Sequence, residues 1–109
     1  MAHASIQNGI GVFSIASPDG GARADVVPEL GGIVSSLRLD GGRECLFRHD
    51  GFWDPAAPET RGGIPPLFPI CGRLLASGTP GLYRVGDRPY RLPIHGFAMR
   101  LPWEVADAS

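Results

Sequence analysis

"IVSSLRLDGGRECLF", residues 33 to 47, is the stretch that decides the fold. Ile33 to Leu39 is rich in β-branched and other apolar residues and predicts a strand. The Asp-Gly-Gly sequence at residues 40 to 42 can adopt the backbone angles of a tight turn, and Glu44 to Phe47 then provides a second strand. The stretch therefore predicts an antiparallel hairpin.

The chain before this hairpin shows the same pattern. Residues 12 to 16 are apolar and β-prone, "SPDGG" at 17 to 21 has the composition of a turn, and residues 22 to 27 alternate small or polar with apolar positions. Nowhere does an apolar period of 3.6 residues, typical of a helix, persist for about ten residues. The expected fold class is therefore all-β, built from antiparallel hairpins.

The second half of the chain adds one more hairpin and an incomplete strand. "LYRVGDRPYRL", residues 82 to 92, places Gly86 and Asp87 where a tight turn is needed, and Pro89 restricts its strand to an edge or end position. Trp103 to Ala106 is expected to begin a further strand. We therefore expect residues 1 to 109 to form part of a larger β-sandwich domain.

Residues 48 to 80 interrupt this strand pattern for longer than a compact domain usually allows. Within them lies "RGGIPPLFPICGRL", Arg61 to Leu74, which is too rich in proline for a helix or a central strand and too apolar for a solvent loop. Its prolines fix φ and remove backbone donors, while its glycines allow close approach. These properties indicate a rigid wall that lines a pocket.

Composition excludes several classes of function. With 109 residues and a formal charge of −1, the chain has room for one small domain and lacks the electrostatic signal for nucleic acid or an anionic membrane. All ten of its cationic residues are arginine, which excludes a Schiff-base lysine and a phosphate-loop lysine. Sixteen glycines and eleven prolines beside 43% hydrophobic residues indicate a turn-rich protein with a core. Small-molecule or protein partners remain.

The two cysteines give no sign of a metal or redox site. Cys45 and Cys71 have neither metal-ligand spacing nor a CxxC arrangement, and no secretory signal or apolar run of membrane length accompanies them. We interpret both as reduced and structural, in a cytoplasmic protein that needs no metal or cofactor.

His95 is the histidine with the strongest case for a role. It lies among apolar residues, where a polar ring needs a hydrogen-bond partner, and Gly96 leaves it unscreened. A satisfied core histidine and a ligand-facing one both remain open. His3, near a terminus expected to fray, and His49, in a polar stretch, are expected to be incidental.

Arg61 and Arg73 bracket the glycine- and proline-rich segment. A guanidinium on a stiffened backbone is a fixed set of donors for sugar hydroxyls, carboxylates or phosphates, although each can equally be solvated or salt-bridged. No pair of carboxylates can be assigned as general acid and base. Aromatic residues can offer an apolar face to a sugar ring or pack in the core; these are Phe52, Trp53, Phe68, Phe97 and Trp103.

Three segments resemble the N-terminal portion of the aldose 1-epimerase (galactose mutarotase-like) family and its hexose-6-phosphate mutarotase branch. They are "ARADVVPELGGIVSSLRLDG" (22 to 41), "RGGIPPLFPICGRL" (61 to 74) and "LPIHGFAMRLPW" (92 to 103), the last two matching the family's RGGIP-type and HGFAR-type segments. The resemblance implies an incomplete galactose mutarotase-like β-supersandwich, of which this chain is the first third. It also implies substrate-binding roles for Arg61, Arg73 and His95.

The resemblance further implies an isomerase that interconverts the α and β anomers of a hexose by acid/base ring opening. The family's catalytic histidine and glutamate lie beyond residue 109, so no catalytic residue is expected here and the chain alone is expected to be inactive. Met99 stands where the phosphosugar branch has arginine, and Arg100 on a strand would face the other way, which favours free hexoses. A non-catalytic carbohydrate-binding module and a structural β domain remain alternatives.

Overall fold

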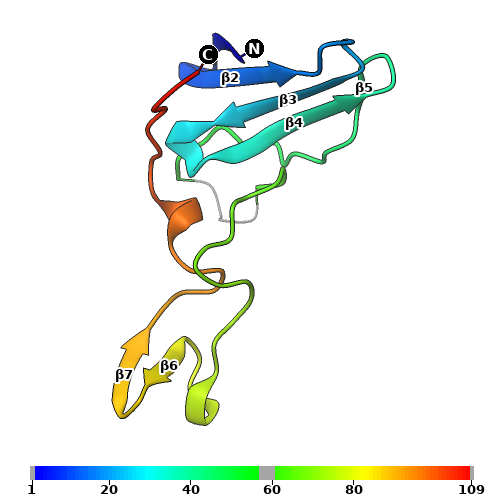
Figure 1. The fold of residues 1–109 in the computed structure, drawn as a ribbon. Helices are drawn as coiled ribbons and strands as arrows, with labels where there is room; N and C mark the ends of the chain where they lie inside the picture. Colours follow the sequence, from blue (N-terminus) through cyan, green and yellow to red (C-terminus); the bar gives the residue numbers. More distant parts are fainter. Residues whose placement is uncertain (1, 57–60, 109) are drawn as a thin grey trace.

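The computed structural model describes residues 2–56 and 61–108, and this part of the chain is all-β with antiparallel strands (Figure 1). The predicted fold class is thereby confirmed. One sheet has five strands in the order of the sequence, and a second has two. The strands are β1 (Ala2–Gln7), β2 (Ile10–Ala16), β3 (Ala22–Val27), β4 (Ile33–Leu39), β5 (Arg43–Glu44), β6 (Leu82–Val85) and β7 (Arg88–Arg91), and three single 3-10 turns are η1 (Pro28–Leu30), η2 (Ala76–Gly78) and η3 (Ala98–Arg100).

The predicted hairpins are present, but two details of the prediction are wrong. β5 ends at Glu44, so it is shorter than the expected strand Glu44 to Phe47. Trp103 to Ala106 forms no strand. The Trp103 backbone N–H donates to Pro28 O and its indole Nε1 donates to Ala98 O, which ties this segment to loops rather than to a sheet edge.

The N-terminal residues form a strand that the sequence did not indicate. β1 pairs with β2 along its whole length, and His3 lies opposite Ser14. The expectation of a frayed end at His3 is therefore wrong, because pairing with β2 satisfies the backbone of β1.

The molecule is elongated, with extents of 52 × 30 × 27 Å. The β6–β7 hairpin lies away from the five-stranded sheet, and two extended segments connect them (Figure 1). One segment belongs to residues 48 to 80, of which residues 57–60 lie outside the described part. No helix among the described residues is both long and apolar enough to cross a bilayer.

The hydrophobic core lies on one face of the five-stranded sheet. Ile10 and Val12 of β2, Val27 of β3 and Ile33 of β4 pack against Phe52, whose exposure is 1%. The Trp53 ring meets the Phe52 ring edge to face at 5.0 Å between centroids. The turn that contains Phe52 thus closes one half of this sheet face.

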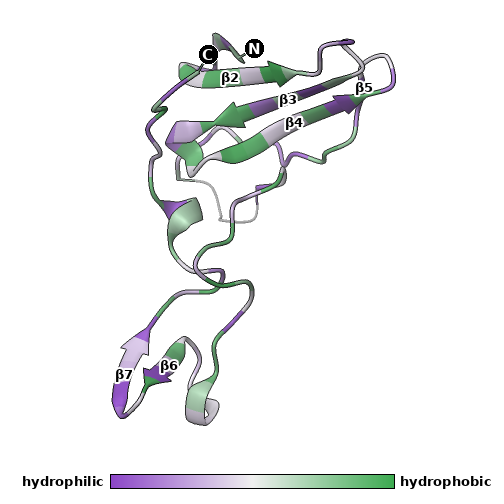
Figure 2. Ribbon diagram, in the orientation of Figure 1, coloured by the Kyte–Doolittle hydropathy of each residue, from purple (hydrophilic) through white to green (hydrophobic). Residues whose placement is uncertain are grey.

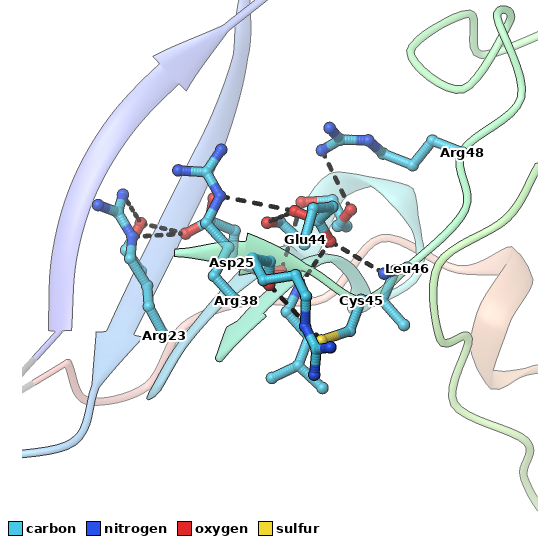
Figure 3. Close-up of polar contacts among 12 residues, drawn as sticks. Arg23, Asp25, Arg38, Glu44, Cys45, Leu46 and Arg48 are labelled. Carbon is cyan, nitrogen blue, oxygen red and sulfur yellow. Dashed lines mark hydrogen bonds and ion pairs between the residues drawn. The ribbon is translucent and has the colours of Figure 1, made fainter. Parts of the chain in front are cut away.

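The other half of the same face is polar (Figure 3). Ser14 Oγ donates to Asp25 Oδ1 at 2.6 Å, and Arg23 Nε lies 3.2 Å from the same oxygen. On the next strand Ser36 Oγ donates to the Glu44 carboxylate. Every buried side-chain nitrogen or oxygen in the described residues has a hydrogen-bond partner, so this half is a satisfied network rather than a defect.

Glu44 is the residue of this network with a strongly shifted pKa. Burial raises the pKa of its carboxyl, but hydrogen bonds from Ser36 Oγ and from the N–H groups of Leu37 and Leu46, with the charge of Arg48, outweigh burial and lower it to about 2. The ionised form is therefore favoured in the folded state.

Replacing Glu44 by glutamine is expected to lower stability at neutral pH but not in strong acid. Because the folded pKa is depressed, the ionised carboxylate stabilises the fold above about pH 4.5, and this contribution disappears as the pH falls toward about 2. Urea unfolding of wild type and E44Q should show a difference in the free energy of unfolding that shrinks over this interval. Asp40→Asn, at an exposed turn, is the control, and an E44Q difference independent of pH would contradict the prediction.

The strand register places mostly apolar residues on the opposite face of the sheet, where some of them are exposed; Figure 2 marks apolar residues along β2, β3 and β4. Because side chains alternate along each strand, this apolar face carries the residues between the buried ones. Ile6 is 76% exposed and Ile15 is 51% exposed. The larger residues on this apolar face are Ile6, Phe13, Ile15, Val26 and Leu37.

Candidate functional site

Residues 61–74 and residues 92–103 meet between the two sheets. Phe68 and Gly96 form a parallel bridge, and the N–H groups of Phe97 and Ala98 both donate to Phe68 O, at 2.9 and 3.2 Å. Residues far apart in sequence are thereby brought to one place, where the chain crosses from the large sheet to the β6–β7 hairpin (Figure 1).

Gly96 is required for this contact. Its φ is +77°, and a Cβ at this position would lie 2.2 Å from Phe68 O, well inside van der Waals contact. Any other residue would push the two segments apart. The glycine of the "IHGF" sequence therefore serves close packing.

His95 is joined to the first segment by two reciprocal hydrogen bonds. Its backbone N–H donates to Gly72 O at 2.8 Å, and the Gly72 N–H donates to its Nδ1 at 2.9 Å. The residue is half-buried and has a φ of +64°, a conformation that is uncommon for a residue with a side chain. The partner that the sequence analysis required is thus Gly72, and Nε2 donates no hydrogen bond to the described part of the chain.

Arg73 follows Gly72 directly, so its backbone is adjacent to the residue that holds His95. Its side chain is exposed and makes no hydrogen bond or ion pair with residues 2–56 or 61–108. The structure therefore brings the Arg73 backbone to the His95 loop and leaves the guanidinium available to a ligand.

Arg61 lies in a different place. Its Nη1 donates to Phe52 O at 2.8 Å and to Asp54 O at 3.2 Å, which anchors the turn that closes the core. It lines a cavity of about 270 Å³ together with Met99 and Arg100. Neither Arg73 nor His95 lines this cavity, and a shared sugar site for all three predicted residues remains a prediction.

The aromatic residues divide into two groups. Phe52 and Trp53 belong to the core, and the Trp103 ring covers Gly32. Phe68 and Phe97 are exposed, and their rings meet edge to face at 6.0 Å between centroids. They lie at the bridge beside His95, so they present an exposed apolar surface there. No local pattern in the sequence separates this pair from the core aromatics.

Arg100 has a role that sequence reasoning missed. Residues 98–100 form η3, so the expectation that Arg100 lies on a strand is wrong. Its Nη1 donates to Ile94 O at 2.9 Å and to Gly96 O at 2.6 Å. The sequence feature that could have indicated this role is the position of Arg100 five residues after His95. The single turn η3 brings its guanidinium back to the loop around His95.

The remaining candidates lie at the surface. Cys45 and Cys71 are both exposed free thiols, so neither is a buried structural cysteine. His49 is exposed, and its Nδ1 accepts from the Gly51 N–H within an exposed turn. In the described part of the chain, His, Cys, Asp and Glu residues form no cluster of three or more that could hold a metal ion.

Comparison with known proteins gives one informative relative. No family model and no curated protein matches the chain. Its structure is similar to the crystal structure of the Slr1438 protein from Synechocystis sp. PCC 6803, with a TM-score of 0.71 and 37% sequence identity over 88% of this chain. The match covers 32% of the Slr1438 chain, so the protein described here spans about a third of the length of that relative.

Proposed function

We propose that this chain carries sugar-binding loops of an aldose 1-epimerase, a mutarotase acting on a free hexose in the cytoplasm. The observation that supports this proposal is the pair of hydrogen bonds between Gly72 and His95, which joins the two segments that resemble that family. They bring the backbone of Arg73 to the His95 loop, beside the exposed rings of Phe68 and Phe97. The all-β sheet would then be the N-terminal part of a galactose mutarotase-like β-supersandwich.

The set of groups around His95 suits an uncharged polyol. A guanidinium and an imidazole N–H donate hydrogen bonds to hydroxyl or ring oxygens, and two phenyl rings pack against the C–H face of a pyranose. Of the two guanidinium groups at this loop, that of Arg100 is engaged by the carbonyl groups of Ile94 and Gly96, so Arg73 alone does not make a cluster for a phosphate group. This composition supports a free hexose over a hexose phosphate, with no role for a nucleic acid or a membrane.

The proposed reaction needs an acid and a base that the His95 site does not supply. A base removes the proton of the anomeric hydroxyl while an acid protonates the ring oxygen, the C–O bond opens, and reclosure on the other face exchanges the anomers. We assign both groups to the part of the longer relatives that this chain does not span. The chain contributes the binding and orientation of the sugar.

A non-catalytic carbohydrate-binding module is the second candidate. It is favoured by the same loops together with the absence of a carboxylate pair beside His95 in the described residues. The two candidates differ in what the complete protein does: a mutarotase accelerates optical equilibration of α-D-glucose, whereas a binding module leaves it at the buffer rate.

Arg73→Ala is expected to weaken hexose binding by about tenfold to a hundredfold, because it removes a charge-assisted hydrogen bond of roughly 1.5–3 kcal/mol. Saturation-transfer NMR or calorimetry with D-glucose and D-galactose measures the effect. His95→Asn, whose asparagine tolerates the left-handed backbone, should also weaken binding. Arg84→Ala, an exposed arginine on β6, is the matched control. Unchanged sugar binding in both R73A and H95N would refute the proposed site.

A further inference from the structure

The loop around His95 is held from two sides. On one side Gly72 exchanges two hydrogen bonds with it, through the backbone and through Nδ1. On the other side the Arg100 guanidinium donates to the carbonyl groups of Ile94 and Gly96, the residues immediately before and after it. The His95 N–H and the carbonyl groups of the residues on both sides of it are therefore engaged in the fold.

The hydrogen bond from Gly72 decides which nitrogen of the imidazole carries the proton. A backbone N–H can only donate, so Nδ1 must accept and has no proton of its own. In the neutral ring the proton then lies on Nε2. A proton on Nδ1 would place two donors against each other at the distance of a hydrogen bond.

The backbone of His95 makes this arrangement dependent on support. A φ of +64° costs a residue with a side chain about 1–2 kcal/mol, and such conformations persist where the surroundings impose them. The two Arg100 hydrogen bonds hold the carbonyl groups on either side of this strained residue. Arg100 reaches them from η3, which is packed against Gly31 through the Met99 backbone.

We infer that Arg100 is a positioning residue which, together with the Gly72 N–H, locks His95 as its Nε2–H tautomer. His95 then presents a fixed hydrogen-bond donor to its ligand. It does not act as a general base, because Nδ1 is already occupied and Nε2 holds the proton. The identity of the acceptor as a hexose oxygen rests on the proposed function; the tautomer and its support by Arg100 do not.

The tautomer is tested without any sugar. Long-range ¹H–¹⁵N correlation of the ring at a pH where His95 is neutral should show one species, with Nε2 protonated. Arg100→Met should lose this single pattern and give a mixture of both tautomers, whereas Arg100→Lys, which keeps a donor, should restore it in part. Arg84→Met, on the exposed surface of β6, should leave the pattern unchanged.

Two outcomes would overturn the inference: an Nδ1–H tautomer in the wild-type protein, or an unaltered single Nε2–H tautomer in a folded R100M variant. If R100M does not fold, hydrogen exchange of the wild-type protein decides. The Gly72 amide should exchange at least about tenfold more slowly than an unbonded amide, and equal rates would refute the bond to Nδ1. Sugar binding enters neither measurement, so failure of the proposed function leaves both results interpretable.

Discussion

Phe52→Ala is expected to reduce the free energy of unfolding by about 3–5 kcal/mol, the usual cost of removing a fully buried aromatic ring. Phe52 is 1% exposed and is the largest side chain in the core, where it contacts residues of β2, β3 and β4. With few other buried apolar residues in the described part of the chain, the sheet has little to compensate for the cavity. Urea unfolding followed by tryptophan fluorescence measures the loss.

Phe47→Ala is the matched control for this experiment. Phe47 is 76% exposed, so the same chemical change should alter the free energy of unfolding by no more than about 0.5 kcal/mol. Equal effects of F52A and F47A would show that the turn containing Phe52 does not close the core as described.

Gly96→Ala is expected to destabilise the contact between residues 61–74 and residues 92–103 by about 2–5 kcal/mol. One part of this loss of stability arises because alanine disfavours the left-handed backbone of residue 96. The other part arises from the collision of the new Cβ with Phe68 O, which lies 2.2 Å away. The amide of Phe97, which donates to Phe68 O, should lose at least about 30-fold of its protection from hydrogen exchange.

Gly9→Ala separates the two contributions. Gly9 has the same φ of +77°, but no atom lies within 4 Å of its would-be Cβ. Gly9→Ala should therefore lower the free energy of unfolding only by the cost of the left-handed backbone, about 1–2 kcal/mol. If G96A costs no more than G9A, the close approach of the segments is not what requires glycine at residue 96.

The hairpins were predictable because their signals are local. The turns at residues 17 to 21, 40 to 42 and 86 to 87 combine residues that accept positive φ or bond their own backbone, next to alternating strands. β1 was missed because Ala, His and Ser carry little β preference, and it is pairing with β2 that orders them. Trp103 to Ala106 has a strand-like composition, but Trp103 is bonded to Pro28 and Ala98 of two 3-10 turns and the segment forms no strand.

The candidate site was predictable in its residues more than in its geometry. The sequence singles out His95 and Arg73, whose roles stay predictions, and the need for a hydrogen-bond partner to His95 followed from its apolar surroundings. That this partner is the backbone of Gly72, 23 residues earlier, depends on a long-range contact that no local pattern encodes. For Arg61 the sequence predicted a ligand-binding role, but its position in the segment gave no sign that it anchors the turn after Phe52.

The apolar face bears on how the sheet is completed. Water against the exposed side chains of Ile6 on β1 and Ile15 on β2 is unfavourable, by about 25 cal/mol for each Å² of apolar surface left wet. A continuous patch of this kind on a β-sheet is complementary to the inner surface of another β-sheet stacked about 10 Å away. β1 to β4 therefore have the surface of one layer in a two-layer architecture, and whatever polypeptide provides the opposing layer shares in the stability of both.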